Sequence, residues 1–149
     1  MLPTIHIRSD ESSSEYATLL FCVGDTDCSY LITDTYQRAL AMGIYHFTQP
    51  EDKLQHIRQV IGDNMLANFS FHKVHIVYTS PTALIIPQEF VSPSANTKMM
   101  DLVFGNDMGT TKEIAEYSYK HNHSVVFRVD EKCHELLLEA FPAANVDHV

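Results

Sequence analysis

The chain has 149 residues, with 10 Lys and Arg side chains against 19 Asp and Glu, and a formal net charge of −9 at pH 7. Its length fits one compact domain or one lobe of a larger fold, and 45% hydrophobic residues are enough to build a core, which excludes wholesale disorder. The acidic charge disfavours nucleic acid and anionic membranes as partners, because both attract proteins through Lys and Arg.

The cysteines and the amino terminus indicate a cytoplasmic protein. Cys22, Cys28 and Cys133 are odd in number and lack C-x-x-C spacing, which argues against a disulfide framework and a zinc ribbon. The amino terminus lacks the basic and apolar regions of a signal peptide. No apolar run approaches the roughly 20 residues needed to cross a bilayer. We therefore expect a soluble protein with reduced thiols and no membrane partner.

The first third of the sequence predicts strands. Ile5 and Ile7 alternate with polar neighbours, which is the period of a half-buried strand. The tetrad Gly24-Asp25-Thr26-Asp27 has the composition of a turn. The strands expected in this region are residues 5–8, 16–23, 29–33 and 38–47.

The clearest helix follows Thr48. Thr48 and Glu51 have the spacing of a capping box, and Pro50 is tolerated in a first helical turn. Apolar residues then recur at helical spacing, and the polar residues 62–64 mark the end of the helix. The predicted apolar stripe consists of Leu54, Ile57, Ile61 and Met65.

The remaining sequence alternates strands with helices. We expect strands at residues 74–78, 84–86, 114–119, 124–129 and 144–149, with the third and fourth of these paired. A second helix is expected at 98–104, with Gly105 as its carboxyl-terminal cap, and a third between Asp130 as N-cap and Pro142. The antiparallel strands expected in the first third, followed by alternating strands and helices, predict an α/β fold with a mixed sheet covered by helices. This ribonuclease-H-like pattern, taken as one domain over residues 1–149, is shared by nucleases, integrases and the lobes of actin-like ATPases.

Several segments carry a resemblance to a known family. They are residues 4–9 (TIHIRS), 78–90 (YTSPTALIIPQEF), 102–104 (LVF), 124–130 (SVVFRVD) and 136–144 (LLLEAFPAA). In these segments the chain resembles an uncharacterised family of Bacteroidetes proteins with an actin-like ATPase fold, although residues 22–47 depart from it. Members of that family are bilobal, so the resemblance implies an amino-terminal lobe. It implies no activity, because the family has none established.

The actin-like resemblance also implies a candidate nucleotide site. Such ATPases hold phosphate on a Gly, Ser or Thr turn after the first strand, where backbone N–H groups form an anion nest. The matching turn is residues 10–14, in which Asp10, Ser12 and Ser13 would hold a phosphate–magnesium group. Glu11 adds negative charge and the turn has no Gly, so we expect an acidic loop without a cofactor, with ATP and magnesium as the alternative.

Other chemistry finds less support in the sequence. A nuclease needs several carboxylates around two metal ions, but beyond Asp10 the strand at 73–79 carries no acid. His121 and His123 would share one face of a strand, yet no zinc-binding signature accompanies them. Cys133 lies beside acidic residues, which do not activate a thiol. We expect no catalytic residue and no metal site.

Protein interaction is the remaining functional class. One apolar run contains Met42, Ile44, Tyr45 and Phe47, and one helix carries Met99, Met100, Val103 and Phe104. Both sets suit either a core or a partner surface. The sequence therefore favours a non-enzymatic interaction or structural lobe that docks on a second lobe, a second copy or another protein. The alternative is a nucleotide-binding lobe of an actin-like ATPase.

Overall fold

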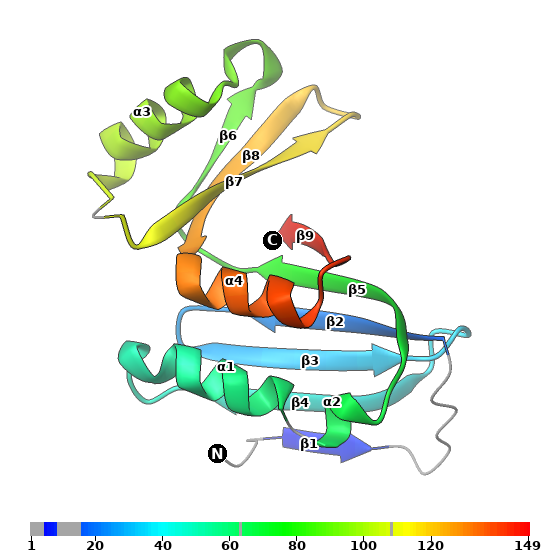
Figure 1. Ribbon diagram of the computed structural model, residues 1–149. Coiled ribbons are helices and arrows are strands. Elements are labelled where there is room, and N and C mark those ends of the chain that lie inside the picture. Colours follow the sequence, from blue (N-terminus) through cyan, green and yellow to red (C-terminus); the bar gives the residue numbers. More distant parts are fainter. Residues whose placement is uncertain (1–4, 9–15, 63, 108) are drawn as a thin grey trace.

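The main body of the protein is a six-stranded sheet (Figure 1). The computed structural model describes residues 5–8, 16–62, 64–107 and 109–149. Within them the strand order is β1-β4-β3-β2-β5-β9. The bounds are β1 Ile5–Arg8, β2 Ala17–Val23, β3 Asp27–Thr33, β4 Ala39–His46, β5 Phe71–Tyr78 and β9 Asn145–His148.

The sheet is mixed, as the sequence predicts. Strands β1, β4, β3 and β2 pair antiparallel, whereas β2, β5 and β9 run parallel. Because β2, β5 and β9 run in one direction, their carboxyl ends meet at one edge of the sheet, which we call the carboxyl edge.

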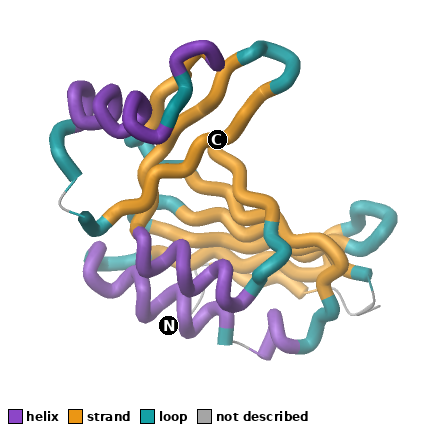
Figure 2. The backbone as a smooth tube through the Cα atoms, turned by 45° about the horizontal axis from the view of Figure 1, so that its top comes forward, coloured by secondary structure: helices purple, strands orange, loops and turns teal. Residues whose placement is uncertain are grey.

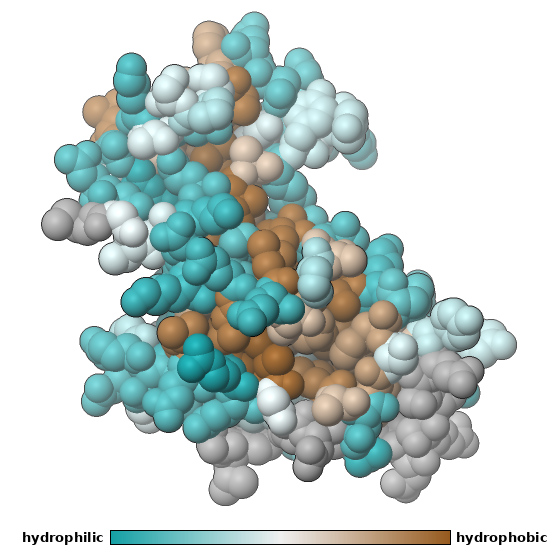
Figure 3. All heavy atoms as spheres, in the orientation of Figure 1, coloured by the Kyte–Doolittle hydropathy of each residue, from teal (hydrophilic) through white to brown (hydrophobic). Residues whose placement is uncertain are grey.

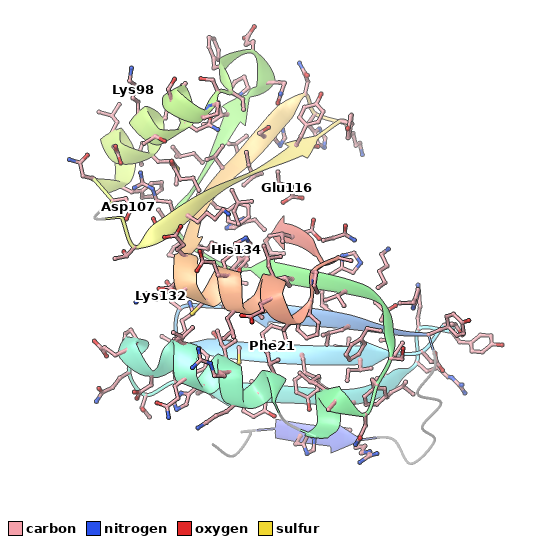
Figure 4. The ribbon with its side chains drawn as sticks, viewed as in Figure 1. Phe21, Lys98, Asp107, Glu116, Lys132 and His134 are labelled. Atoms are coloured by element: carbon pink, nitrogen blue, oxygen red, sulfur yellow. The ribbon has the colours of Figure 1, made fainter. Side chains whose placement is uncertain are left out.

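Two helices lie side by side on one face of this sheet, which we call the covered face (Figures 1 and 2). They are α1 (Lys53–Ile61) and α4 (Glu131–Ala140). Alternate residues of the central strands point towards them and are almost fully buried, as Figure 4 shows for Phe21. The strand residues of this core include Leu19, Phe21, Val23, Tyr30, Ile32, Tyr45 and Ile76.

The first helix begins differently from the sequence prediction. A short 3-10 turn, η1 (Pro50–Asp52), precedes α1, and neither Gln49 nor Asp52 caps with its side chain. The predicted Thr48 capping box is therefore wrong, because the turn opens at Pro50, two residues beyond Thr48. The predicted stripe to Met65 is also interrupted, since α1 ends at Ile61 and a separate helix, α2 (Asn64–Ala67), follows.

The other two predicted helices have the expected caps. The Asp130 carboxylate accepts a hydrogen bond from the Cys133 N–H at 2.8 Å and begins α4. Gly105 ends α3 (Pro93–Phe104) with a φ of 85°, a conformation that favours glycine. The helix begins five residues before the predicted start, because Ser92 caps it and Pro93 suits its first turn.

A smaller three-stranded sheet is inserted between β5 and α4 (Figure 1). Its order is β6-β8-β7, with β6 at Ala83–Pro87, β7 at Thr111–Ser118 and β8 at His123–Asp130. A 3-10 turn, η2 (Gln88–Phe90), leads from β6 towards α3, which covers one face of this sheet. The contact is built on Ile86, Met100 and Val126. The predicted pairing of β7 with β8 is confirmed.

The second face of the main sheet also carries apolar side chains. Leu20, Leu31, Met42 and Ile7 lie opposite one another across four strands. We call this the open face; its apolar residues are Ile7, Leu20, Cys22, Leu31, Met42, Ile44 and Val77. The side chain of Ile7 is 57% exposed, and most of the others are half-buried. In the part of the chain that the structure describes, no helix packs on this face.

Substitutions at neighbouring residues on the two faces should lower the free energy of unfolding by different amounts. Leu19 is fully buried on the covered face, whereas Leu20 lies half-buried on the open face. Leu19→Ala leaves a cavity and should lower the free energy of unfolding by about 3 kcal/mol. The matched Leu20→Ala should cost about 1 kcal/mol or less. Urea denaturation measures both, and equal losses would show that Leu20 also belongs to a packed core.

Candidate functional site

A polar cleft lies at the carboxyl edge, between the main sheet and the inserted sheet. It has a volume of about 450 Å³ and appears in Figure 3 as a notch at the left of the molecule. Open α/β sheets usually bind ligands outside the carboxyl ends of their strands, so the position of this cleft is typical of a ligand-binding site. The polar side chains lining the cleft are those of Asp25, Lys53, Ser80, Thr82, Asn106, Asp107, Thr110, Thr111, Arg128 and Asp130.

The Arg128 guanidinium is held by protein groups. Its side chain is only 6% exposed, and it donates to the Gly105 carbonyl at 2.9 Å and to the Asp101 carboxylate at 2.5 Å. The Arg128 Nε lies 3.7 Å from the Glu113 carboxylate. These contacts neutralise the charge of Arg128 and tie β8 to the end of α3. Arg128 therefore acts as a structural link within the inserted part and is not free to grip an anion.

The acids of the cleft also have structural partners. Asp130 caps α4. Asp107 accepts a hydrogen bond from the Thr111 hydroxyl at 2.6 Å, which is the main reason that the pKa of Asp107 lies below its usual range. Figure 4 shows Asp107 above the start of α4. Among the described residues, no three His, Cys, Asp or Glu side chains are placed to hold a metal ion. Three of the charged side chains that line the cleft, those of Arg128, Asp107 and Asp130, therefore have partners within the protein.

The predicted phosphate turn lies elsewhere in the chain. Asp10, Ser12 and Ser13 fall outside the described residues, so this prediction stays untested. The nearest described residues are Arg8 and Tyr16. The register places Arg8 beside Ala41, near the start of β4. This end of the sheet lies opposite the carboxyl edge and its polar cleft. The turn at the cleft is instead the hairpin between β2 and β3.

The two histidines singled out by the sequence pack against each other, and Cys133 is buried. The rings of His121, in the turn after β7, and His123, at the start of β8, stack with centroids 5.5 Å apart. Cys133 is buried under the covered face, and burial raises the pKa of its thiol to about 12. Burial raises the pKa of Cys28 to about 12 in the same way. Both therefore remain neutral thiols near pH 7.

An apolar groove lies at the opposite end of α4. Its volume is about 520 Å³, and Figure 3 shows hydrophobic atoms gathered in this region. The aromatic side chains that line it are Phe69, Phe71, His72 and Phe141. The Phe71 and Phe141 rings meet edge to face, 6.2 Å apart, so part of the lining already packs on itself.

The structure separates the residues of both predicted apolar runs. Met42 and Ile44 lie on the open face, whereas Tyr45 and Phe47 are buried in the main core. On α3, Met100 is fully buried, while Val103 and Phe104 are exposed. Sequence reasoning missed Leu20 and Leu31 on the open face. The available signal was that β2 and β3 place large apolar residues at both alternating sets of positions.

Tyr78, at the end of β5, contacts both α4 and the inserted sheet. The Tyr78 hydroxyl lies 2.8 Å from the His134 Nδ1, and the Tyr78 ring packs 6.1 Å from Phe127. Below the inserted sheet, the His148 N–H donates to the Glu116 carboxylate at 3.0 Å; Figure 4 shows Glu116 and His134 in this region. Burial raises the pKa of Tyr78, so its phenol stays protonated and can donate to a neutral imidazole.

The environment of His134 predicts a pH-dependent stability. Burial lowers the pKa of His134, and the nearby positive charge of Lys112 lowers it further, although Glu135 opposes this. As pH falls below about 6.5, the unfolded chain takes up a proton at His134 before the folded chain does. Folding stability should therefore decrease with falling pH, by at most about 1.4 kcal/mol per pH unit, until the folded-state pKa is passed.

The control for this prediction is His134→Gln, which cannot titrate. Urea denaturation from pH 8 to pH 5 should show the stability difference between the two proteins changing below about pH 6.5. A difference that stays constant over this range would contradict the assignment.

Comparison with known proteins supports the fold. The chain is similar to a crystal structure from Bacteroides thetaiotaomicron VPI-5482, a protein with an actin-like ATPase fold and unknown function. The TM-score is 0.80 at 16% identity, and the match covers 94% of this chain and 55% of that one. This chain therefore spans about half the length of that protein. The chain has an α/β fold of the actin-like, ribonuclease-H-like kind.

Other comparisons add little about function. A foamy viral protease–reverse transcriptase in complex with dsDNA matches with a TM-score of 0.35 and 9% identity, over 95% of this chain and 25% of that one. No curated protein matches. Within the described ranges, none of the helices is both long and apolar enough to span a bilayer. A family model matches residues 8–149, and the chain belongs to that family, described as protein of unknown function (DUF3822).

Proposed function

We propose that this protein is a protein-interaction lobe that binds a partner through the open face of its main sheet. The observation that carries this proposal is the row of Leu20, Leu31, Met42 and Ile7 across four strands. None of these side chains packs into the two hydrophobic cores. Large contiguous apolar patches are uncommon on monomeric proteins and usually mark interaction sites.

The energetics of the open face favour burial. Each large aliphatic side chain that passes from water into an apolar contact contributes about 1.5–3 kcal/mol relative to full exposure. The residues of this face are already half-buried, so each would contribute only part of that range. Several such side chains together still offer a substantial driving force for association, which the polar cleft does not.

The polar cleft supports the non-enzymatic part of the proposal. Arg128 is neutralised by Asp101 and Glu113, and Asp130 is occupied as a helix cap. A catalytic site needs groups that converge on one reacting atom, within hydrogen-bond reach of it. Arg128, Asp107 and Asp130 of this cleft are instead engaged in contacts that hold the fold together.

Nucleotide binding remains the alternative proposal. The favourable observation is the polar cleft at the carboxyl edge of a sheet whose fold is that of an actin-like ATPase. In that case ATP and magnesium would be held by this lobe. The candidate contacts expected from the sequence are Asp10, Ser12 and Ser13, although they follow Arg8, which lies at the end of the sheet away from this cleft.

Site-specific photo-crosslinking in cells tests the interaction proposal. A photoreactive amino acid replaces Leu31 on the open face, and the matched control replaces Gln59, which is exposed on α1. We expect a discrete crosslinked protein from position 31 only, and its yield should fall when Leu20→Asp is added. Equal products from both positions, or none from position 31, would contradict the proposal.

The melting temperature of the unmodified chain, measured with and without ATP and Mg²⁺, distinguishes the interaction proposal from the nucleotide-binding alternative. A ligand at 100 times its Kd stabilises the native state by about 2.7 kcal/mol. The interaction proposal expects no change in Tm with millimolar ATP and Mg²⁺, whereas a saturable rise in Tm would support the nucleotide-binding lobe.

A further inference from the structure

We propose that the occupant of the open face is a single amphipathic α-helix from a second lobe, lying antiparallel to β2, β5 and β9. This inference rests on the proposed interaction function and specifies the kind of partner. It follows from the composition of the sheet, the length of the related protein and the charges at the two ends of the face.

The parallel strands of the sheet call for a helical cover. Sheets of parallel strands are normally covered by helices on both faces, whereas antiparallel sheets commonly have one face exposed to solvent. Here β2, β5 and β9 are parallel, and α1 and α4 cover only one of their faces. The open face places Leu20, Cys22 and Val77 on two of these parallel strands. A helix on this face would complete the usual three-layer arrangement.

The dimensions of the face suit one helix. Strand β2 has seven residues and is therefore about 23 Å long. A helix of about 16 residues has nearly the same length. The similar Bacteroides protein contains a further part that this chain does not match, since the match covers only 55% of it. We take the occupant to be a helix from such a part.

The charges at the ends of the open face define the direction of the helix. Asp27 lies on this face at the carboxyl edge, as does Asp147, which is 3.5 Å from His75. Lys73 lies at the opposite end, beside Thr18. The amino end of a helix carries partial positive charge and its carboxyl end partial negative charge. The amino end should therefore rest near Asp27 and Asp147 and the carboxyl end near Lys73.

Cys22 provides a built-in reporter for this face. Its thiol lies on the open face and is half-buried, whereas Cys28 and Cys133 are buried under the covered face. A helix seated on Leu20 and Leu31 would also cover Cys22. The rate at which Cys22 reacts with a maleimide therefore measures occupancy of the open face, with the other two thiols as internal controls.

The experiment supplies the helix by fusion to the full 149-residue chain. Val149 donates to the Tyr78 carbonyl and so ends at the carboxyl edge, where the amino end of the helix should lie. A flexible linker after Val149 carries a designed helix with Leu at positions i, i+3, i+4 and i+7. The matched control has Gln in place of these Leu residues. Peptide mapping by mass spectrometry measures labelling of each cysteine, and circular dichroism checks that both fusions fold.

We expect Cys22 to react about tenfold more slowly in the Leu fusion than in the Gln fusion, because a tethered segment acts at millimolar effective concentration. Adding Lys73→Gln to the Leu fusion should reduce this protection about twofold. The exposed control Arg58→Gln should leave it unchanged.

Two results would overturn the helix proposal. Equal Cys22 rates in both fusions at every protein concentration would show that the face does not accept a helix; photo-crosslinking at position 31 would still decide the interaction function by itself. Alternatively, slow labelling in the unfused chain that speeds up on dilution, with a dimer mass in light scattering, would identify a second copy as the occupant. That outcome would keep the interaction function and reject the helix.

Discussion

The fold depends on the central strands β2 and β3, which supply apolar side chains to both faces of one sheet. In β2, Leu19, Phe21 and Val23 enter the covered face, while Leu20 and Cys22 point the other way. Successive side chains of a strand point to opposite faces of the sheet. A shift of one residue in the pairing register would therefore move every covered-face side chain to the open face. The covered face has its helices within this chain. The open face has the same kind of side chains without a described cover, and the proposed function follows from that asymmetry.

The inserted sheet is attached to the body by apolar, aromatic and polar contacts, and Phe127 and Val129 of β8 belong to the main core. Tyr78 at the end of β5 reaches His134 on α4 and packs on Phe127 of β8. Arg128, one residue further along β8, ties the strand to the end of α3. Since β8 continues directly into the Asp130 cap of α4, these contacts also position that helix. The polar cleft beside them is thus explained largely by the joining of the two parts.

Much of the fold follows from local sequence signals. Asp130 and Gly105 are recognisable caps because their roles depend on their immediate neighbours, and the mixed sheet follows from the order of strands and helices. The Thr48 box failed because Pro50 opened the turn after it. The second sheet could not be predicted, since pairing of β6 with β8 joins segments about 40 residues apart. The open face could be predicted only in part from the sequence. Met42 and Tyr45 belong to the same apolar run, and only the strand register shows that they point to opposite faces of the sheet.

The two faces of the main sheet differ in how well they are covered, and methionine oxidation measures this difference. Met42 lies on the open face, whereas Met100, on α3, is fully buried against the inserted sheet. Treatment of the folded chain with dilute hydrogen peroxide, followed by peptide mapping, should oxidise Met42 well before Met100. Equal protection of both residues in the monomeric chain would contradict the open face and the interaction function built on it.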